Sequence, residues 1–187
     1  PEGTRRRLER LQEELDRRKI PLRLYPGSEI FFRHGAEELL SEGKLLTLAD
    51  SRYCLTEFFP EEDYAYIRDG LSRLSSFGYL PILAHAERYE QVMEDGRAQE
   101  LKRRTGCLYQ VNAASLTGEN GFGYKSRSRK LVKNGLADFI ATDAHDERAR
   151  APRIERCADW LEKHYGADER DRLLIHNPAA GLEDRTI

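Results

Sequence analysis

The chain has 187 residues, enough for a hydrophobic core, and we expect a single domain over residues 1–187. Charged residues make up 34% of it and hydrophobic residues 39%, and 31 basic residues nearly balance 33 acidic ones. This balance gives no reason to expect nucleic acid as the main partner, and no apolar run approaches the roughly 20 residues that span a bilayer. No signal peptide is visible, and the three cysteines lack CxxC spacing, so we expect reduced thiols and a cytoplasmic protein.

The first third of the chain begins with a helical pattern. Leucines at helical spacing predict an amphipathic helix over residues 3–18. Alternating apolar and polar residues then predict a strand over residues 20–25, which Pro26-Gly27 ends. We therefore expect Glu29 just past the carboxyl end of a strand.

The rest of the chain alternates strands with helices. The predicted strands cover residues 45–49, 53–58, 80–84, 107–111 and 136–141. The predicted helices cover residues 36–41, 60–76, 87–104, 126–134, 152–164, 168–174 and 178–182. Such alternation predicts an α/β protein with a parallel sheet, either open or closed into a barrel.

The clearest candidate for metal binding follows the strand at residues 136–141. In an extended backbone, residues i and i+2 point to the same side, so the Asp143 carboxylate and the His145 imidazole would converge. Such a pair is a natural half-site for a divalent metal ion. The alternative is a surface Asp and His in an ordinary loop, because D-x-H is a short and common pattern.

Two further strand ends carry residues of the same type. Glu29 and His85 each stand at such a position, as Asp143 and His145 do. In an α/β barrel the carboxyl ends of the strands share one face, and active sites lie there. We therefore predict that these four side chains gather around shared metal ions.

Two arginines follow the predicted ligands closely. Arg88 lies three residues after His85, and Arg150 lies five residues after His145. Guanidinium groups beside a metal centre favour a phosphate or another oxyanion, which arginine binds in bidentate fashion. The alternative for each arginine is an ordinary surface charge or ion pair.

Five strings of residues resemble a known family in their order and spacing. They are PGSEI (26–30), YCLTEF (53–58), GYLPILAHAERY (78–89), QVNAASLTG (110–118) and IATDAHD (140–146). The chain resembles the bacterial metal-dependent protein-tyrosine phosphatases of capsule and exopolysaccharide synthesis. This family belongs to the polymerase-and-histidinol-phosphatase (PHP) superfamily, and the resemblance covers nearly all of the chain.

The resemblance implies a distorted (β/α)7-type PHP barrel with a multinuclear metal site, usually filled by manganese. It implies a metal-bridging carboxylate at Glu29, metal-binding side chains at His85, Asp143 and His145, and phosphate-binding guanidinium groups at Arg88 and Arg150. From the four ligands and the two arginines we expect direct attack of a metal-activated water on phosphotyrosine, without a phosphoenzyme. The implied partner is the phosphotyrosine tail of a bacterial tyrosine autokinase, which the phosphatase regulates.

The chain departs from the family pattern in two places. Ala86 stands where the family has proline, which affects loop stiffness alone. The family also carries a first barrel strand with a His-x-His pair, and further ligands, in roughly 50 residues upstream of the position of Pro1. We therefore expect one or two N-terminal βα units to be missing. Two alternatives stay open: a small-molecule phosphomonoesterase of the histidinol-phosphatase type, and a truncated, non-catalytic interaction domain.

Overall fold

The computed structural model describes residues 1–148 and 150–187, and it has one parallel sheet at its centre. The strands are β1 (Glu29–Phe31), β2 (Tyr53–Glu57), β3 (Leu80–Leu83), β4 (Leu108–Asn112) and β5 (Phe139–Ala141), and they lie side by side in chain order. Every neighbouring pair is parallel. The predicted α/β class with a parallel sheet is thus confirmed.

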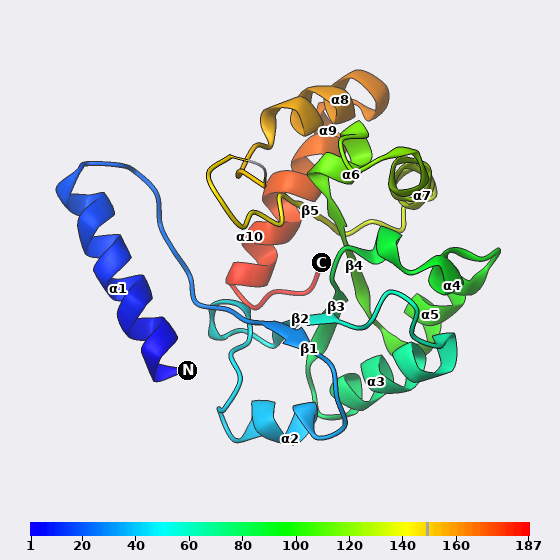
Figure 1. Ribbon diagram of the computed structural model, residues 1–187, viewed down its shortest axis with the longest axis horizontal. Coiled ribbons are helices and arrows are strands. Elements are labelled where there is room, and N and C mark those ends of the chain that lie inside the picture. The colour runs from blue at the N-terminus through cyan, green and yellow to red at the C-terminus, as the bar shows by residue number, and fades with distance from the viewer. Residues whose placement is uncertain (149) are drawn as a thin grey trace.

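Helices connect the strands and surround the sheet (Figure 1). They are α1 (Glu2–Arg17), α2 (Ala36–Ser41), α3 (Tyr64–Ser76), α4 (Glu90–Met93), α5 (Arg97–Thr105), α6 (Ala113–Thr117), α7 (Phe122–Lys133), α8 (Glu155–Tyr165), α9 (Ala167–Asp171) and α10 (Asn177–Leu182), with short helical turns η1 (Leu48–Asp50), η2 (Ala86–Arg88) and η3 (Arg172–His176). In the described part of the chain, no helix has both the length and the apolar character needed to cross a membrane.

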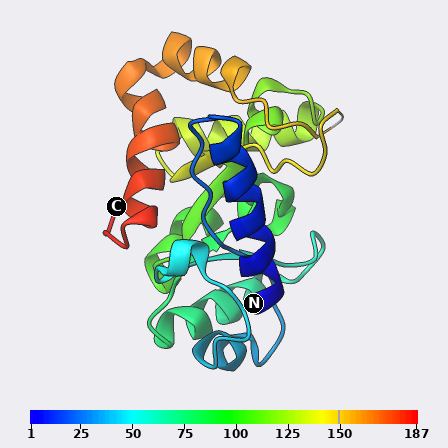
Figure 2. The same cartoon turned by 90° about the vertical axis from the view of Figure 1, so that its left-hand side faces the viewer.

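The first helix stands apart from the body of the molecule. In Figure 1 the α1 helix lies at the end of a long extended segment, and in Figure 2 it lies in front of the remaining elements. None of its residues is buried. The packed part of the fold therefore begins with the segment that leads into β1.

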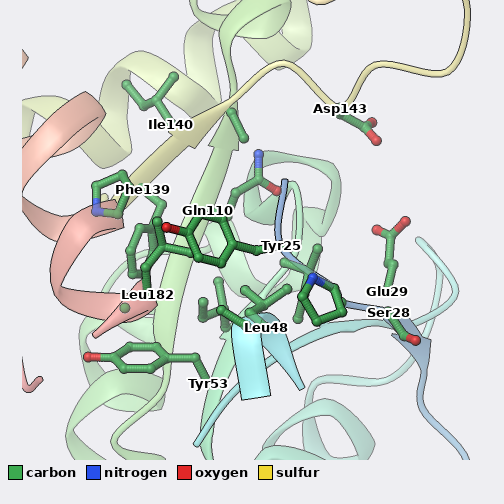
Figure 3. A pocket seen from close by; sticks show the side chains of 18 of the residues that line it. Tyr25, Ser28, Glu29, Leu48, Tyr53, Gln110, Phe139, Ile140, Asp143 and Leu182 are labelled. Atoms are coloured by element: carbon green, nitrogen blue, oxygen red, sulfur yellow. The ribbon is translucent and has the colours of Figure 1, made fainter. Parts of the chain in front are cut away.

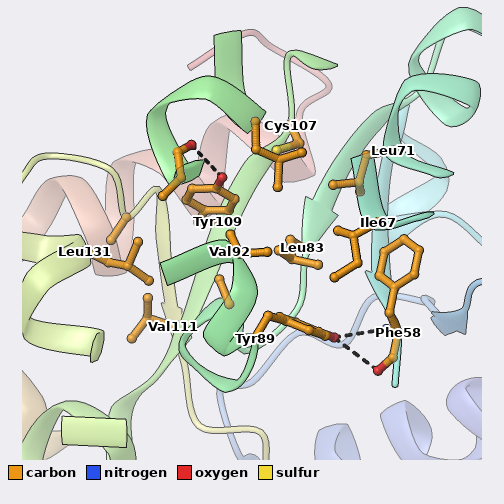
Figure 4. Close-up of a cluster of buried hydrophobic side chains, with 14 of the residues drawn as sticks. Phe58, Ile67, Leu71, Leu83, Tyr89, Val92, Cys107, Tyr109, Val111 and Leu131 are labelled. Atoms are coloured by element: carbon orange, nitrogen blue, oxygen red, sulfur yellow. Dashed lines mark hydrogen bonds between the residues drawn. The ribbon is translucent and has the colours of Figure 1, made fainter. Parts of the chain in front are cut away.

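The main hydrophobic core packs the sheet against the helices α2 to α8 and the turn η3. From α3, Ile67, Leu71 and Leu74 are fully buried, because positions i, i+4 and i+7 share one face of a helix. Figure 4 shows Tyr89 in this core, where its hydroxyl accepts a hydrogen bond from the backbone N–H of Phe58 at 3.0 Å. This bond joins the segment after β3 to the end of β2.

Two of the predicted strands are wrong. Residues 20–25 are extended but pair with no strand in the described structure, and Ile20 and Leu22 are 42% and 54% exposed. Residues 45–49 run into the turn η1, because Ala49 and Asp50 adopt left-handed backbone conformations that an extended strand excludes. A segment with alternating apolar residues forms a strand only where another strand lies beside it to form hydrogen bonds.

Several helix boundaries also differ from the prediction. The helix predicted over residues 87–104 is divided into η2, α4 and α5, with Gly96 in a left-handed conformation before α5. The helix predicted from Pro60 begins at Tyr64, and the short helix α6 was not predicted. The break before α5 turns the chain so that α4 and α5 pack closely against the core.

Candidate metal and phosphate site

Three side chains that can bind a metal meet at one end of the sheet. The Nε2 atom of His85 lies 3.1 Å from Oε1 of Glu29 and 3.4 Å from Oε2 of Glu57. One possible ligand atom from each residue lies within 4.8 Å of the other two. Two carboxylates and one imidazole form a donor set that suits a divalent transition metal.

The register of the sheet brings the two glutamates together. Glu29 is the first residue of β1, which corrects the prediction that it follows a strand. It pairs with Leu55, and Phe31 pairs with Glu57. Because side chains two residues apart in a strand share a face, Glu29 and Glu57 point to the same side of the sheet.

Glu57 was not predicted as a ligand, although a signal for it was present. It is the last residue of β2, and so occupies the kind of strand-end position that singled out His85 after β3. Applying the same rule to every predicted strand would have found it.

Asp143 and His145 also converge, but for a different reason than predicted. The strand β5 ends at Ala141, and Asp143 has a positive φ of 53°, so the backbone there is not extended. The Nδ1 atom of His145 lies 2.9 Å from the backbone oxygen of Asp143 and 3.7 Å from its Oδ1. A turn therefore brings the pair together, and the side chain of His145 remains 50% exposed.

Both predicted phosphate-binding arginines reach Asp143. Arg88 and Arg150 donate hydrogen bonds to its Oδ2 atom at 3.1 and 2.6 Å. Asn112 donates to the same oxygen at 3.0 Å. Two guanidinium groups thus lie side by side, although 62 positions of sequence separate them. Such a pair can bind two oxygens of one phosphate group.

Among the described residues, Asp143 and His145 do not join the cluster of Glu29, Glu57 and His85, so the four predicted ligands do not meet at one point. One residue from each group, Glu29 and Asp143, lines a shared cavity of about 590 Å³. Glu29, Gln110 and Asp143 are among its lining residues, and the rest of the lining is mostly apolar. In Figure 3 the carboxylates of Glu29 and Asp143 lie on the same side of this cavity and face one another. Glu29 thus connects the ligand cluster to this cavity, and Asp143 connects the arginine pair to it.

A chain of hydrogen bonds joins the two groups through the sheet. The backbone N–H of His85 donates to Oε1 of Gln110 at 2.6 Å, and Nε2 of Gln110 donates to Oδ1 of Asn112 at 2.8 Å. Asn112 then donates to Asp143. Gln110 and Asn112 are both buried, so their side-chain amides form hydrogen bonds with protein groups in place of water.

The cysteines take no part in this site. All three are free and buried. Burial raises the pKa of Cys54 to about 12, of Cys107 to about 11 and of Cys157 to about 12. Because the thiolate is the nucleophilic form, these side chains are poor nucleophiles at neutral pH.

Comparisons with known proteins identify the family to which the chain belongs. The family described as capsular polysaccharide synthesis, CpsB/CapC, matches residues 1–183. Tyrosine-protein phosphatase YwqE of Bacillus subtilis (strain 168) is 31% identical over 187 residues, which cover 100% of this chain and 73% of YwqE. Tyrosine-protein phosphatase CpsB of Streptococcus pneumoniae is 31% identical over 166 residues, which cover 86% of this chain and 68% of CpsB.

A solved structure gives the same result for the fold. It belongs to a study of YwqE from Bacillus subtilis and CpsB from Streptococcus pneumoniae, described as unique metal-dependent tyrosine phosphatases. The TM-score is 0.92 at 30% sequence identity, and the match covers 100% of this chain and 75% of the other. The predicted PHP-type α/β fold is confirmed by this match.

Proposed function

Because the chain belongs to the CpsB/CapC family of capsular polysaccharide synthesis, we propose that it is a metal-dependent protein-tyrosine phosphatase. The relatives CpsB and YwqE are tyrosine-protein phosphatases, which favours this function over a small-molecule phosphomonoesterase or a non-catalytic domain. The observation that carries the proposal is the cluster of Glu29, Glu57 and His85 beside the arginine pair.

The charges of the cluster fit a bound cation. Glu29 and Glu57 contact neither lysine nor arginine among residues 1–148 and 150–187, and His85 is their shared partner. Two carboxylates so placed repel one another unless positive charge lies between them. We assign these three residues, together with Asp143 and His145, as metal ligands. Manganese is the ion we expect, since carboxylate-rich donor sets suit it.

The remaining residues bind and orient the phosphate. When bound, the metal ions supply Lewis-acid activation of water and neutralise charge. Arg88 and Arg150 bind the non-bridging oxygens and stabilise the negative charge that the phosphoryl group carries during transfer. Asn112 holds Asp143 in place through its side-chain amide. No protein nucleophile is needed, in keeping with the raised pKa values of the thiols.

The biological partner follows from the family. A phosphatase of capsular polysaccharide synthesis would act on the phosphotyrosine tail of a tyrosine autokinase that controls polysaccharide assembly, and we expect both to meet in the cytoplasm. The side chains of Arg88 and Arg150 are 29% and 44% exposed, so a flexible phosphorylated tail can reach them.

The test combines metal binding with phosphatase activity. Manganese affinity is measured by calorimetry, and phosphate release is measured on a phosphotyrosine peptide with and without a chelator. We expect Glu57→Gln to weaken manganese binding at least about tenfold, because it removes one charged ligand. Glu100→Gln, on the outer helix α5, is the matched control and should bind manganese as the unchanged protein does.

Two results would contradict the proposal. One is equal manganese affinity in Glu57→Gln and Glu100→Gln. The other is hydrolysis of phosphotyrosine that continues unchanged after the chelator has removed divalent metal. Either result would show that the cluster of Glu29, Glu57 and His85 does not bind a metal ion that the reaction requires.

A further inference from the structure

A second cavity, of about 540 Å³, adjoins the candidate phosphate site. Four of its lining residues are arginines: Arg88, Arg148, Arg150 and Arg153. Asp143 lines both this cavity and the one that Glu29 lines, so the two cavities are neighbours. The volume lies within the range of about 300–1,000 Å³ that is usual for ligand sites.

The positive charge of this cavity is only partly balanced from within. Arg88 and Arg150 contact Asp143. The carboxylate of Glu119, which also lines the cavity, is bound by Arg156 at 2.9 Å.

Arg153 and Arg148 supply charge beyond these pairs. Within the described chain, the side chain of Arg153 makes neither a hydrogen bond nor an ion pair. Arg148 reaches Glu147 at 3.6 Å, and both of those side chains are more than four-fifths exposed. Solvent screens such a contact strongly, so Arg148 keeps most of its capacity to bind an anion.

The cavity also offers surface that suits a peptide. Tyr124 and Pro60 line it, and the guanidinium of Arg127 lies over the Tyr124 ring at 5.0 Å, which holds the ring in place. An aromatic side chain and a proline beside free guanidinium groups favour a segment that has both apolar and acidic side chains.

We propose that this second cavity binds the peptide next to the phosphotyrosine, and that Arg153 and Arg148 select an aspartate or glutamate there. The inference rests on the proposed function, because it assumes that Arg88 and Arg150 bind the phosphate. An extended peptide advances about 3.3 Å per residue, so the acidic side chain belongs one to three positions from the phosphotyrosine. The protein would thus prefer acidic phosphotyrosine sequences over neutral ones.

The experiment compares three phosphotyrosine peptides of equal length. One has acidic residues before the phosphotyrosine, one has them after it, and one has Asn and Gln in their place. We expect kcat/KM for one acidic peptide to exceed that for the neutral peptide about three- to tenfold at low salt, and the preference to vanish in 0.5 M NaCl. The difference should lie in KM, because the contacts of Arg153 and Arg148 with the peptide stabilise the bound substrate and the transition state equally.

Two variants and one control identify the residues. Arg153→Ala, and the double variant with Arg148→Ala, should bring the ratio of acidic to neutral kcat/KM close to one. Arg103→Ala removes an exposed arginine on α5, away from the cavity, and should keep the ratio of the unchanged protein. Circular dichroism confirms that each variant is folded.

The outcomes separate this inference from the proposed function. If p-nitrophenyl phosphate is hydrolysed but acidic and neutral peptides are equal, the inference is overturned and the phosphatase function stands. If no phosphoester is hydrolysed in the presence of manganese, fluorescence anisotropy of the same peptides decides. An acidic preference that Arg153→Ala abolishes would support the inference, and equal binding of all three peptides would overturn it.

Discussion

The chain of hydrogen bonds from His85 through Gln110 and Asn112 to Asp143 is the most informative feature at the scale of single residues. Each side-chain amide uses one donor and one acceptor within it, and both amides are buried. A buried amide without a hydrogen-bond partner is unfavourable in free energy. The hydrogen bonds therefore favour the one arrangement of the strand ends in which both amides have partners. Two ligand groups from β3 and β5 are therefore positioned by one network.

We predict that Asn112→Ala lowers manganese affinity or kcat about 10- to 100-fold, as removal of residues that orient ligands usually does. The variant removes the donor to Asp143 and the acceptor for Gln110. Calorimetric titration with manganese and steady-state kinetics measure the effect. Asn134→Ala, at the end of α7, is the control and should match the unchanged protein. Unaltered metal affinity in Asn112→Ala would show that the network does not position the ligands.

The buried thiols give a prediction about pH. Because burial raises the pKa of Cys54 to about 12, the folded protein keeps a proton that the unfolded chain loses above its ordinary thiol pKa of about 8.5. Stability should therefore fall as pH rises above that value, by at most about 1.4 kcal/mol per pH unit for each thiol. Urea unfolding at pH 8 and 9.5 measures the fall, and Cys54→Ala should show a smaller one. An equal fall in the variant would be evidence against this linkage.

At the scale of elements, the two strands β3 and β5 both lead into residues with left-handed backbone. His85 has φ 34° and Asp143 has φ 53°, and neither is glycine. Such conformations are costly for residues with a side chain and are frequent at functional sites. In both cases the left-handed residue directs a candidate ligand toward the end of the sheet. The unfavourable backbone conformation thus positions the side chains of the site.

The helix α3 allows a test of packing against helix propensity. A methyl group at Gly70 would lie 2.7 Å from Cε1 of Phe32, whose ring is buried. Alanine favours a helix over glycine by about 1 kcal/mol, whereas overpacking a core costs about 1–3 kcal/mol. We therefore expect Gly70→Ala to lower the free energy of unfolding by up to about 2 kcal/mol in urea titrations.

The control for this prediction is a second helical glycine with free space. A methyl group at Gly123, in α7, would meet nothing closer than 3.7 Å, at Nη1 of Arg127. Gly123→Ala should therefore raise the free energy of unfolding by up to about 1 kcal/mol. Stabilisation by both substitutions would mean that the Phe32 ring moves aside at little cost.

At the scale of the whole molecule, residues far apart in the sequence close the fold around the sheet. The hydroxyl of Tyr53 in β2 donates to the backbone oxygen of Arg185 at 2.6 Å. The backbone N–H of Arg52 donates to Oδ1 of Asp184 at 2.9 Å. These bonds hold the segment after α10 against the sheet, beside the cavity that reaches the candidate site.

We predict that Tyr53→Phe lowers the free energy of unfolding by about 1 kcal/mol, the usual net contribution of one hydrogen bond. Thermal and urea denaturation measure the change. Tyr79→Phe is a matched control, because the hydroxyl of Tyr79 has no hydrogen bond to other described residues, and it should change stability less. Equal effects of the two substitutions would show that the bond to Arg185 contributes nothing to stability.

Much of this protein is determined by its sequence alone. The alternation of strands and helices and the closeness of Arg88 to His85 both depend on neighbours within a few residues. Local periodicity therefore predicted the α/β class, and strand-end positions singled out His85 and Asp143 as candidate residues, whereas the strand predicted before Glu29 is absent from the described structure. The family match and the solved structure confirm the resemblance from which the phosphatase function was inferred.

Only the tertiary structure decided which strand-end residues meet. Glu57 joins Glu29 through the register of β1 on β2, and Gln110 reaches His85 from the neighbouring strand β4. The segment at residues 20–25 has a strand pattern but no partner strand in the described structure. Pairing, register and hydrogen bonds between strands join residues that are distant in sequence. The residue pattern of one segment does not specify which other segment will lie next to it.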